Sequence, residues 1–361
     1  MNIVRVALAV PLPRFFDYLY PPDLMPIVGG RVLVPFGSQK RVGIVVDLPA
    51  SSDVAKEKLK PILDVLDAES LFNSTTWDWL AWSANYYRAA LGDVLFQALP
   101  VKLRNGESAV KNDRTFWRIT DLGKQALESG ELKRAKKQIE ALNLLLTQDL
   151  EKGNNEISSA IWSALKGKDY VEEIIVPTEQ KSWQRALGDN PLVNLDNRLT
   201  LNKQQALAFS QLLFQEGFNV WLLEGVTGSG KTEIYLQYIE EVLKKGKQVL
   251  VLVPEIGLTP QTVRRFQARF YVEIDVLHSN LNDTQRLNVW ERARTGQSAI
   301  VIGTRSALFT QFSNLGAIIL DEEHDASYKQ QDSWRYHARD LAIVLAQKLN
   351  IAVLMGSATP S

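Results

Sequence analysis

The residues with the clearest chemical role form a glycine-rich segment from Gly225 to Thr232. It starts with one glycine, continues through four residues, ends in Gly-Lys-Thr, and follows the apolar run 220–223 after one residue, Glu224. Glycines let the backbone curl so that amide groups point at phosphate oxygens, and a helix that begins here adds the positive end of its dipole. We expect Lys231 to reach the β- and γ-phosphates of ATP and the Thr232 hydroxyl to bind magnesium. The predicted phosphate-binding residues are Gly225, Gly228, Ser229, Gly230, Lys231 and Thr232.

A group of acidic residues follows a second apolar run. Residues 317–320 are apolar, and Asp321, Glu322 and Glu323 come directly after them. A phosphate-binding loop needs one carboxylate that holds magnesium and another that polarises the attacking water. We assign Asp321 to magnesium and Glu322 to the general base, because adjacent carboxylates repel unless a cation neutralises them. Together with Lys231, Asp321 and Glu322 predict ATP hydrolysis. The alternative is that the acidic residues only form a solvated turn.

The composition limits the classes of protein that remain. The 361 residues include 41 basic and 41 acidic side chains, so contacts with nucleic acid must come from local patches. There is no cysteine and there are three histidines, which argues against disulfides, a thiolate zinc site and a structural metal. The N-terminal run lacks a basic leader, and no stretch approaches the ~20 apolar residues that span a bilayer. We expect a soluble cytoplasmic protein.

The order of apolar and polar stretches predicts a multidomain α/β protein. Residues 1–105 read as a small β-rich module with a hairpin at residues 37–38 and then a helix with Trp79, Trp82 and Tyr86 on one buried face. Residues 106–176 have the pattern of a winged helix, which would dock DNA or protein or serve as a spacer, and the polar residues 177–198 predict a linker.

Apolar strands alternate with amphipathic helices in residues 199–361, which predicts a doubly wound parallel sheet. The strands are expected at 220–224, 249–253, 274–278, 300–303, 317–320 and 351–355.

An aromatic and basic loop lies at residues 325–340. Bases stack on aromatic faces while Arg and Lys hold phosphates, so this composition is suited to single-stranded DNA. The predicted contacts are Tyr328, Lys329, Trp334 and Arg335, and their place beside Glu322 would let bound DNA influence hydrolysis. The alternative is that Trp334 and Tyr336 only fill a local core.

The run Asp-Glu-Glu-His at 321–324 separates helicase-type ATPases from kinases and GTPases, and on this motif the chain resembles a superfamily 2 helicase. Three further segments, VPEIGLTPQ at 253–261, GTRSA at 303–307 and GSATP at 356–360, stand where that family has its motifs. The resemblance implies a RecA-like motor lobe at 199–361. It also implies DNA-backbone contacts by the first two segments, Thr304 and Arg305 among them, and coupling of hydrolysis to movement by the third. Gln205 matches the adenine-reading glutamine of the family, with a plain helix start as the alternative.

Over its whole length the chain resembles the primosomal replication-restart DNA helicases, through DEEHDASYKQQDSWRYHARDLA, VALAVPLPRFFDYLYP and GGRVLVPFG. The resemblance implies a 3′-end DNA-binding domain at 1–105, with a pocket formed by Phe16, Asp17, Gly37 and Lys60. It implies 3′ to 5′ unwinding driven by ATP and Mg²⁺, recognition of stalled or abandoned forks, and assembly of the primosome that reloads the replicative helicase. The implied partners are branched DNA with a leading-strand 3′ end, single-stranded DNA, single-stranded-DNA-binding protein, primosome accessory proteins and the loader of the replicative helicase.

The family pattern continues beyond the Ser-Ala-Thr segment (residues 356–360) into a zinc-binding segment and a second motor lobe with an arginine finger. Neither is found in the 361 residues. Because arginine fingers are worth ~10³ to 10⁵ in rate, the chain alone is expected to bind ATP weakly and not to unwind DNA. Two other interpretations stay open: a non-catalytic fork-binding module, and another DNA-translocating superfamily 2 ATPase.

Overall fold

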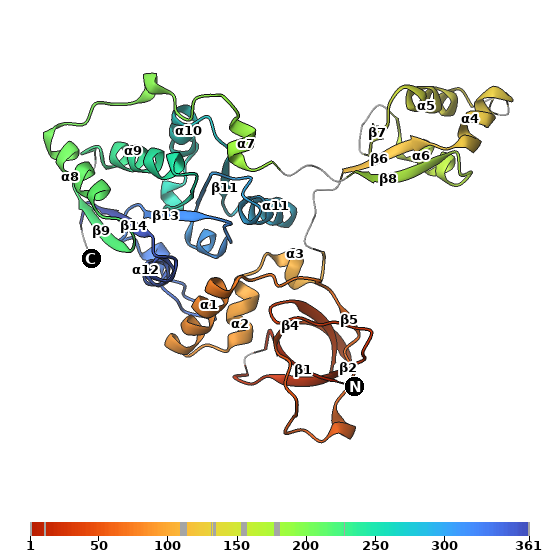
Figure 1. Cartoon of the computed structure of the whole chain (residues 1–361), viewed down its shortest axis with the longest axis horizontal. Coiled ribbons are helices and arrows are strands. Elements are labelled where there is room, and N and C mark those ends of the chain that lie inside the picture. The colour runs from red at the N-terminus through yellow and green to blue at the C-terminus, as the bar shows by residue number, and fades with distance from the viewer. Residues whose placement is uncertain are drawn as a thin grey trace. The chain divides into compact units, whose positions relative to one another are not determined.

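The computed structural model describes residues 2–10, 12–108, 114–130, 132, 135–152, 157–176, 181–226 and 228–359. The chain divides into two compact units (Figure 1). One contains residues 1–109 and 181–361, and the other contains residues 110–180. Each unit is described by itself below.

The first five strands form a small antiparallel barrel, drawn in red and orange in Figure 1. The strands are β1 (Asn2–Leu8), β2 (Phe16–Tyr20), β3 (Arg31–Phe36), β4 (Gln39–Asp47) and β5 (Asp64–Val65), in the order β2-β1-β4-β3-β5. The Leu19 amide donates to the Lys60 carbonyl, and the Ile62 amide donates to the Leu19 carbonyl. These bonds join β2 to the segment before β5 and so bring the two edges of the sheet together.

The predicted hairpin is confirmed by the pairing of β3 with β4. Phe36 lies opposite Gln39, so only Gly37 and Ser38 form the turn. Gly37 has a φ of 61°, a conformation in which a side chain is strained, and open space surrounds it.

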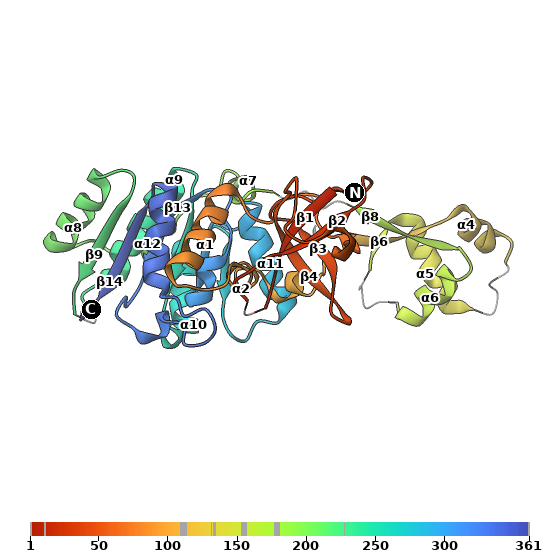
Figure 2. The ribbon, with the colours of Figure 1, turned by 90° about the horizontal axis from the view of Figure 1, so that it is seen from below.

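Three helices follow the barrel and pack on the parallel-sheet part of the same unit: α1 (Ser74–Tyr86), α2 (Leu91–Gln97) and α3 (Val101–Arg104). Trp79 is 1% exposed, and its indole nitrogen donates to the Leu341 carbonyl at 2.9 Å. Figure 2 shows α1 beside α12, the helix that contains Leu341. The predicted aromatic face is wrong in one residue, because Tyr86 is 61% exposed and stacks on Trp82 at the surface.

Residues 199–361 contain the predicted parallel sheet. Its six strands lie in the order β11-β12-β10-β13-β14-β9, and every neighbouring pair is parallel. The strands are β9 (Asn219–Glu224), β10 (Gln248–Leu252), β11 (Ile274–Leu277), β12 (Ile300–Gly303), β13 (Leu315–Leu320) and β14 (Ala352–Ser357). Because the strands are parallel, their carboxyl ends meet at one edge, where the predicted functional segments begin.

Helices cover both faces of this sheet. α8 (Lys203–Phe214), α9 (Lys231–Lys244) and α10 (Pro260–Arg269) share one apolar core with it, whereas α11 (Asp283–Arg294) and α12 (Ala338–Leu349) share the other core with α1 and α2. The strands β10, β12, β13 and β14 are buried almost throughout because helices cover both of their faces, as expected for a doubly wound sheet, whereas alternate residues of the edge strand β9 are exposed.

The predicted linker at 177–198 differs from the structure over most of its length. Residues 177–180 lie outside the described part. The next residues include α7 (Trp183–Leu187), and Trp183 is 3% exposed in the core shared with α9. The amide of Asn194 donates to the carbonyl of Arg269 at 2.7 Å. Because this stretch is polar in composition, its sequence does not indicate the buried Trp183 or the hydrogen bond of Asn194.

The described residues of the unit at 110–180 form three antiparallel strands in the order β7-β6-β8 and three helices. Its elements are β6 (Arg114–Ile119), α4 (Asp121–Glu128), α5 (Lys136–Thr147), β7 (Leu150–Glu151), α6 (Ser159–Lys166) and β8 (Val171–Val176). Trp117 and Trp162 stack in its core with ring centroids 5.3 Å apart. This succession of helices and edge strands matches the expected pattern, and a DNA-docking role for the unit stays a prediction.

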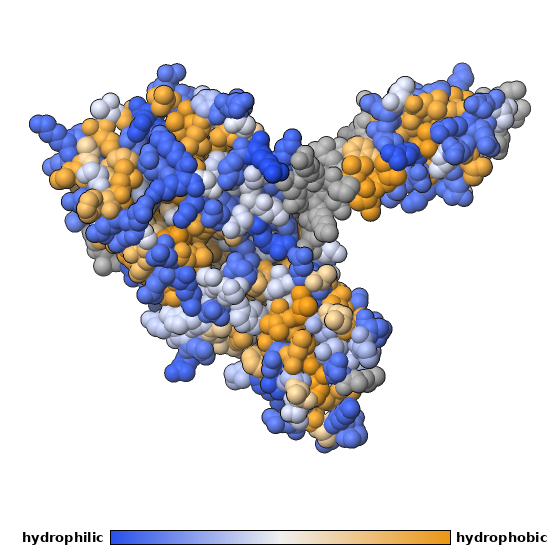
Figure 3. Space-filling view, in the orientation of Figure 1, coloured by the Kyte–Doolittle hydropathy of each residue, from blue (hydrophilic) through white to orange (hydrophobic). Residues whose placement is uncertain are grey.

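Hydrophobic residues reach the surface in patches over the N-terminal barrel, whereas hydrophilic residues cover much of the parallel-sheet part on the face shown in Figure 3. Exposed apolar side chains of the barrel segment include Phe15 and Met25, at 44% and 75% exposure.

Candidate ATP and nucleic-acid sites

The glycine-rich segment lies between β9 and α9, as the sequence predicted. Gly230 precedes the first turn of α9 with a φ of 85°, and Gly228 has a φ of 82°. The Ser229 amide donates to the Val226 carbonyl at 3.0 Å, which closes a tight turn. Thr227 lies outside the described residues. The fold therefore presents the amino end of a 14-residue helix to the site, a position that favours anions.

Lys231 lies between the glycine-rich segment and the acidic residues. Its ammonium group donates to the Gly225 carbonyl and lies 4.0 Å from Oε1 of Glu322. The side chain is 9% exposed, so its charge acts in surroundings that screen it weakly. The structure thus brings together two of the three predicted catalytic residues.

Asp321 directly follows β13 and is half-buried beside Glu322. Burial raises the pKa of Asp321, the negative charge of Glu322 raises it further, and a hydrogen bond from Tyr235 and the charge of Lys231 act in the opposite direction. The Tyr235 hydroxyl donates to Oδ1 of Asp321 at 3.2 Å. Burial also raises the pKa of Tyr235, so this hydroxyl stays protonated and remains a donor.

Glu322 has a φ of 47°, in the left-handed region that non-glycine residues rarely adopt. Such backbone costs of order 1–2 kcal/mol, and it occurs preferentially at functional sites. Oε2 of Glu322 lies 3.7 Å from Nδ1 of His324. The unusual backbone therefore turns the predicted general base toward Lys231 and His324.

The Ser-Ala-Thr segment, at the end of β14, is bonded directly to the acidic residues. Oγ of Ser357 lies 2.7 Å from Nδ1 of His324, and the Glu323 amide donates to the Gly356 carbonyl at 2.9 Å. The Ser357 carbonyl accepts from the Gly225 amide at 3.1 Å. This segment therefore contacts both halves of the site; its last residue, Pro360, lies outside the described part.

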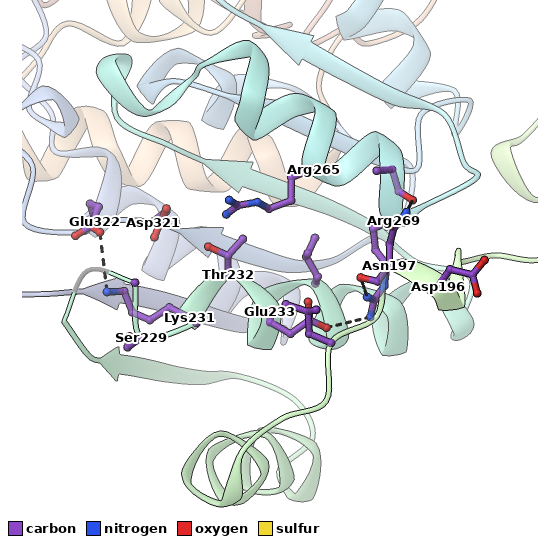
Figure 4. Close-up of a pocket in the computed structure, with 15 residues that line it drawn as sticks. Asp196, Asn197, Ser229, Lys231, Thr232, Glu233, Arg265, Arg269, Asp321 and Glu322 are labelled. Atoms are coloured by element: carbon purple, nitrogen blue, oxygen red, sulfur yellow. Dashed lines mark hydrogen bonds and ion pairs between the residues drawn. The ribbon is translucent and has the colours of Figure 1, made fainter.

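These parts surround one cavity of about 650 Å³, shown in Figure 4. Seven of the predicted residues line it: Gly228, Ser229, Gly230, Lys231, Thr232, Asp321 and Glu322. Amide donors, a lysine, a hydroxyl and two carboxylates in one hollow can bind a polyphosphate with a divalent cation and activate a water. Thr232 and Asp321 have the hard oxygen ligands that Mg²⁺ takes.

Gln205 lies against the glycine-rich segment, although it does not line the cavity. Its amide nitrogen donates to the Ser229 carbonyl at 2.8 Å, and its oxygen accepts from the Asn202 amide at 2.9 Å. Asn202 in turn accepts from the Gln205 amide, so the pair caps α8. Gln205 therefore both caps the start of α8, as the alternative holds, and contacts the glycine-rich segment. Adenine recognition by Gln205 stays a prediction.

The two segments expected along DNA border a second cavity, of about 500 Å³. It is lined by Thr259 and Pro260 of one segment, by Thr304 of the other, and by His278 at the end of β11. Hydroxyls and loop amides at strand ends suit the contacts that nucleic-acid phosphates take. The sequence did not identify His278, whose position one residue after β11 was the available signal.

Arg305 does not line this cavity, and its guanidinium is hydrogen-bonded within the protein. Its guanidinium donates to the carbonyls of Ser327 and Lys329, both at 2.8 Å. Between them, Tyr328 is 0% exposed, and its hydroxyl donates to the Leu252 and Asp321 carbonyls. The prediction that Tyr328 stacks on DNA is wrong for this structure, because the ring has no accessible face.

Trp334 also belongs to the protein interior. It is 2% exposed, and its ring lies 5.4 Å from Phe309 and 4.6 Å from Tyr336 between ring centroids. The prediction of base stacking by Trp334 is therefore corrected in favour of the local-core alternative. Lys329 and Arg335 are exposed and stay candidates for phosphate contacts.

The predicted 3′-end residues lie in one part of the barrel. The rings of Phe16 and Phe36 meet edge to face at 5.2 Å, which brings Gly37 near the start of β2, and Lys60 bonds to Leu19 later in that strand. Phe16 is half-buried, whereas Gly37 and Lys60 are exposed.

Asp17 is held in place by its neighbours. Arg5 donates to both carboxylate oxygens, at 2.8 and 3.1 Å, and Ser52 donates to Oδ2 at 2.6 Å. Burial would raise the pKa of Asp17, but the hydrogen bonds from Arg5 and Ser52 and the charge of Arg5 outweigh burial and lower it. A carboxylate has about four acceptor positions, so one stays open for a ligand.

Among the described residues there is no group of three or more His, Cys, Asp and Glu side chains that could hold a metal by themselves. None of the helices within the described ranges is long and apolar enough to cross a membrane.

Comparisons with known proteins found matches to both ends of the larger unit. Residues 5–100 match the family model of the 3′DNA-binding domain (3′BD), and residues 202–361 match that of the DEAD/DEAH box helicases. The chain is 78% identical to "Replication restart protein PriA" of Haemophilus influenzae, over 100% of this chain and 50% of that protein. It is 30% identical to the protein of the same name in Bacillus subtilis, over 100% of this chain and 54% of that protein. The chain thus spans about half the length of the curated relatives that it matches.

Among solved structures, RecG bound to a three-way DNA junction is similar over 45% of this chain and 21% of that one, with 25% identity and a TM-score of 0.36.

Proposed function

We propose that this chain, which carries a 3′DNA-binding domain and a DEAD/DEAH box helicase domain and aligns throughout with replication restart proteins, is the N-terminal part of an ATP-dependent DNA helicase that restarts replication. The observation that carries the proposal is the meeting of Lys231, Thr232, Asp321 and Glu322 on one cavity at the carboxyl edge of a parallel sheet.

ATP is the proposed ligand of the cavity. The amides of the glycine-rich segment and the amino end of α9 attract its phosphates, and Lys231 neutralises part of their charge. Thr232 and Asp321 would hold Mg²⁺, which would offset the negative charge of the phosphates. The raised pKa of Asp321, a half-buried carboxylate beside Glu322, is consistent with a site where a cation would offset the two negative charges.

Glu322 is the proposed general base. Its turned backbone brings the carboxylate within 4.0 Å of Lys231, where it can orient a water and accept its proton. His324 and Ser357 join the acidic residues to the Ser-Ala-Thr segment at 2.7 Å. A change in that contact gives a route by which hydrolysis could move the lobe.

The N-terminal barrel is the proposed reader of a DNA 3′ end. The open acceptor position of Asp17 suits the hydrogen of a 3′-hydroxyl, and the exposed turn at Gly37 lets a strand approach closely. We further propose that the protein recognises stalled or abandoned forks, unwinds DNA 3′ to 5′, and acts with single-stranded-DNA-binding protein, primosome accessory proteins and the loader of the replicative helicase. The names of its relatives support the restart role; the direction and the partners rest on the family resemblance.

The test is Lys231→Ala in a form of the protein that hydrolyses ATP. We expect loss of ATP hydrolysis and of unwinding of forked DNA, with fork binding retained. A docking module without motor activity would keep its function in this variant, and unchanged unwinding would rule out the proposal. Substrates with only a 3′ or only a 5′ single-stranded tail test the direction separately.

A further inference from the structure

Helix α10 is a wall that two cavities share. Arg265, Ala268 and Arg269 line the ATP cavity, whereas Val263, Arg264 and Gln267 line the cavity beside Thr259 and Thr304. Because successive residues of a helix point about 100° apart, adjacent arginines at 264 and 265 can face different hollows. The side chain at 265 is thus directed to the nucleotide side.

The two arginines on that side have different surroundings. Arg269 is 1% exposed, donates to the Asn197 carbonyl at 2.9 Å, and lies 3.3 Å from Glu233 and 3.5 Å from Glu240. Its charge is already balanced. Arg265, one turn earlier, is exposed, and no hydrogen bond or ion pair with another described residue engages its guanidinium.

Figure 4 shows where this free cation points. Arg265 extends from α10 over Thr232 toward Asp321, from the wall opposite the glycine-rich segment. Lys231 approaches the same hollow from the other wall. A polyphosphate between them would meet a cation on each side, and the planar guanidinium can donate two parallel hydrogen bonds to phosphate oxygens.

We propose that Arg265 is a nucleotide-binding residue that contacts the phosphates of ATP from the wall opposite Lys231. The parallel-sheet part of the chain thereby supplies an arginine to its own phosphate site. This arginine comes from α10, the helix that begins at Thr259 and Pro260 beside the second cavity. This assignment rests on the proposed ATP function, and it adds a contact that no motif of the sequence marks.

Equilibrium titration of the 361-residue chain with Mg-ATP and with AMP tests the assignment. We expect Arg265→Gln to weaken ATP binding about tenfold, the loss of one charge-assisted contact, and to leave AMP binding unchanged. Arg265→Lys, which keeps the charge but not the fork, should fall between the two. Arg185→Gln is the matched control, because Arg185 is an exposed helical arginine on α7 that lines neither cavity.

Two results would overturn the assignment. One is wild-type ATP affinity in Arg265→Gln while Lys231→Ala loses ATP binding. The other is an equal loss for ATP and AMP, which would indicate a structural role. ATP binding that Lys231→Ala leaves intact would instead refute the proposed ATP function, so the two failures are distinguishable. Thermal melting of each variant checks that the fold is intact.

Discussion

The hydroxyl of Tyr235 donates to Oδ1 of Asp321 at 3.2 Å and so joins the helix after the glycine-rich segment to the predicted magnesium ligand. The absence of a side chain at Gly356 makes this contact possible, because a Cβ there would lie 1.5 Å from the Tyr235 hydroxyl oxygen. Tyr235 lies on α9, Asp321 follows β13, and Gly356 belongs to β14. Three segments that are far apart in sequence therefore meet at this one hydrogen bond. Tyr235 is a positioning residue: it orients a group that is proposed to hold the cation.

Tyr235→Phe should shift the pH dependence of ATP hydrolysis. The Tyr235 hydrogen bond lowers the pKa of Asp321, against burial and the charge of Glu322, which raise it. Removal of the bond raises that pKa further, so the ionised form requires a higher pH and the acidic limb of the profile moves upward. We also expect kcat to fall about tenfold, as for other residues that orient a metal ligand.

The matched control for that experiment is Tyr238→Phe. Tyr238 lies on the same helix, and burial alone raises its pKa. Its variant should keep the wild-type profile. An unshifted acidic limb in Tyr235→Phe would show that Tyr235 does not act through Asp321.

Gly356→Ala should destabilise the fold, because the new Cβ would meet the Tyr235 hydroxyl oxygen at 1.5 Å and its ring carbon Cζ at 2.8 Å. Overpacking of this kind costs about 1–3 kcal/mol. Chemical denaturation measures the free energy of unfolding. Combining Gly356→Ala with Tyr235→Ala should recover part of the lost stability. Strictly additive effects of the two substitutions in a double-mutant cycle would contradict the contact.

Asp17→Asn should remove the preference of the barrel for a 3′-hydroxyl over a 3′-phosphate. Asn has about the same size, but it brings no negative charge to repel the phosphate. Binding of the chain to two DNA strands that differ only at the 3′ end measures the ratio of dissociation constants. Asp47→Asn is the control, since Asp47 also faces Arg5, at 3.8 Å, but is largely exposed. Equal discrimination in Asp17→Asn and wild type would reject the end-reading role.

Trp334→Ala should reduce stability by about 3–5 kcal/mol, the usual cost of truncating a buried aromatic side chain. The ring fills a core with Phe309 and Tyr336, so its loss leaves a cavity. Arg335→Gln, on the next residue, should leave the melting temperature unchanged and weaken single-stranded DNA binding more at low salt than at high salt. A stable Trp334→Ala that loses only DNA binding would restore the stacking hypothesis.

The sequence was sufficient for most of the fold and for the centre of the ATP site. Continuous apolar runs ended by turn residues placed the strands of the parallel sheet within about two residues of their observed bounds, since strands buried on both faces have that pattern. The glycine-rich segment and the acidic residues follow two such runs, and parallel pairing puts both at one edge. Lys231 and Glu322 meet for that reason.

What the sequence missed depends on contacts between distant segments. Tyr235 reaches Asp321 across 86 residues, and nothing local marks it. Base stacking by the aromatic loop is a wrong prediction because composition does not say which side chains face inward. The available signal is that Trp334 and Tyr336 flank Arg335 at a spacing of two, which is typical of an extended chain whose alternate side chains face the same side. Trp183 anchors a stretch whose polar composition predicted a linker.

A structure of this chain bound to a non-hydrolysable ATP analogue and Mg²⁺ tests the central claim most directly. We expect the phosphates between the glycine-rich segment and Asp321, with the Lys231 ammonium within hydrogen-bond distance of a phosphate oxygen and the cation beside Thr232 and Asp321. Nucleotide found only outside this cavity, or absent from it at saturating concentration, would contradict the account.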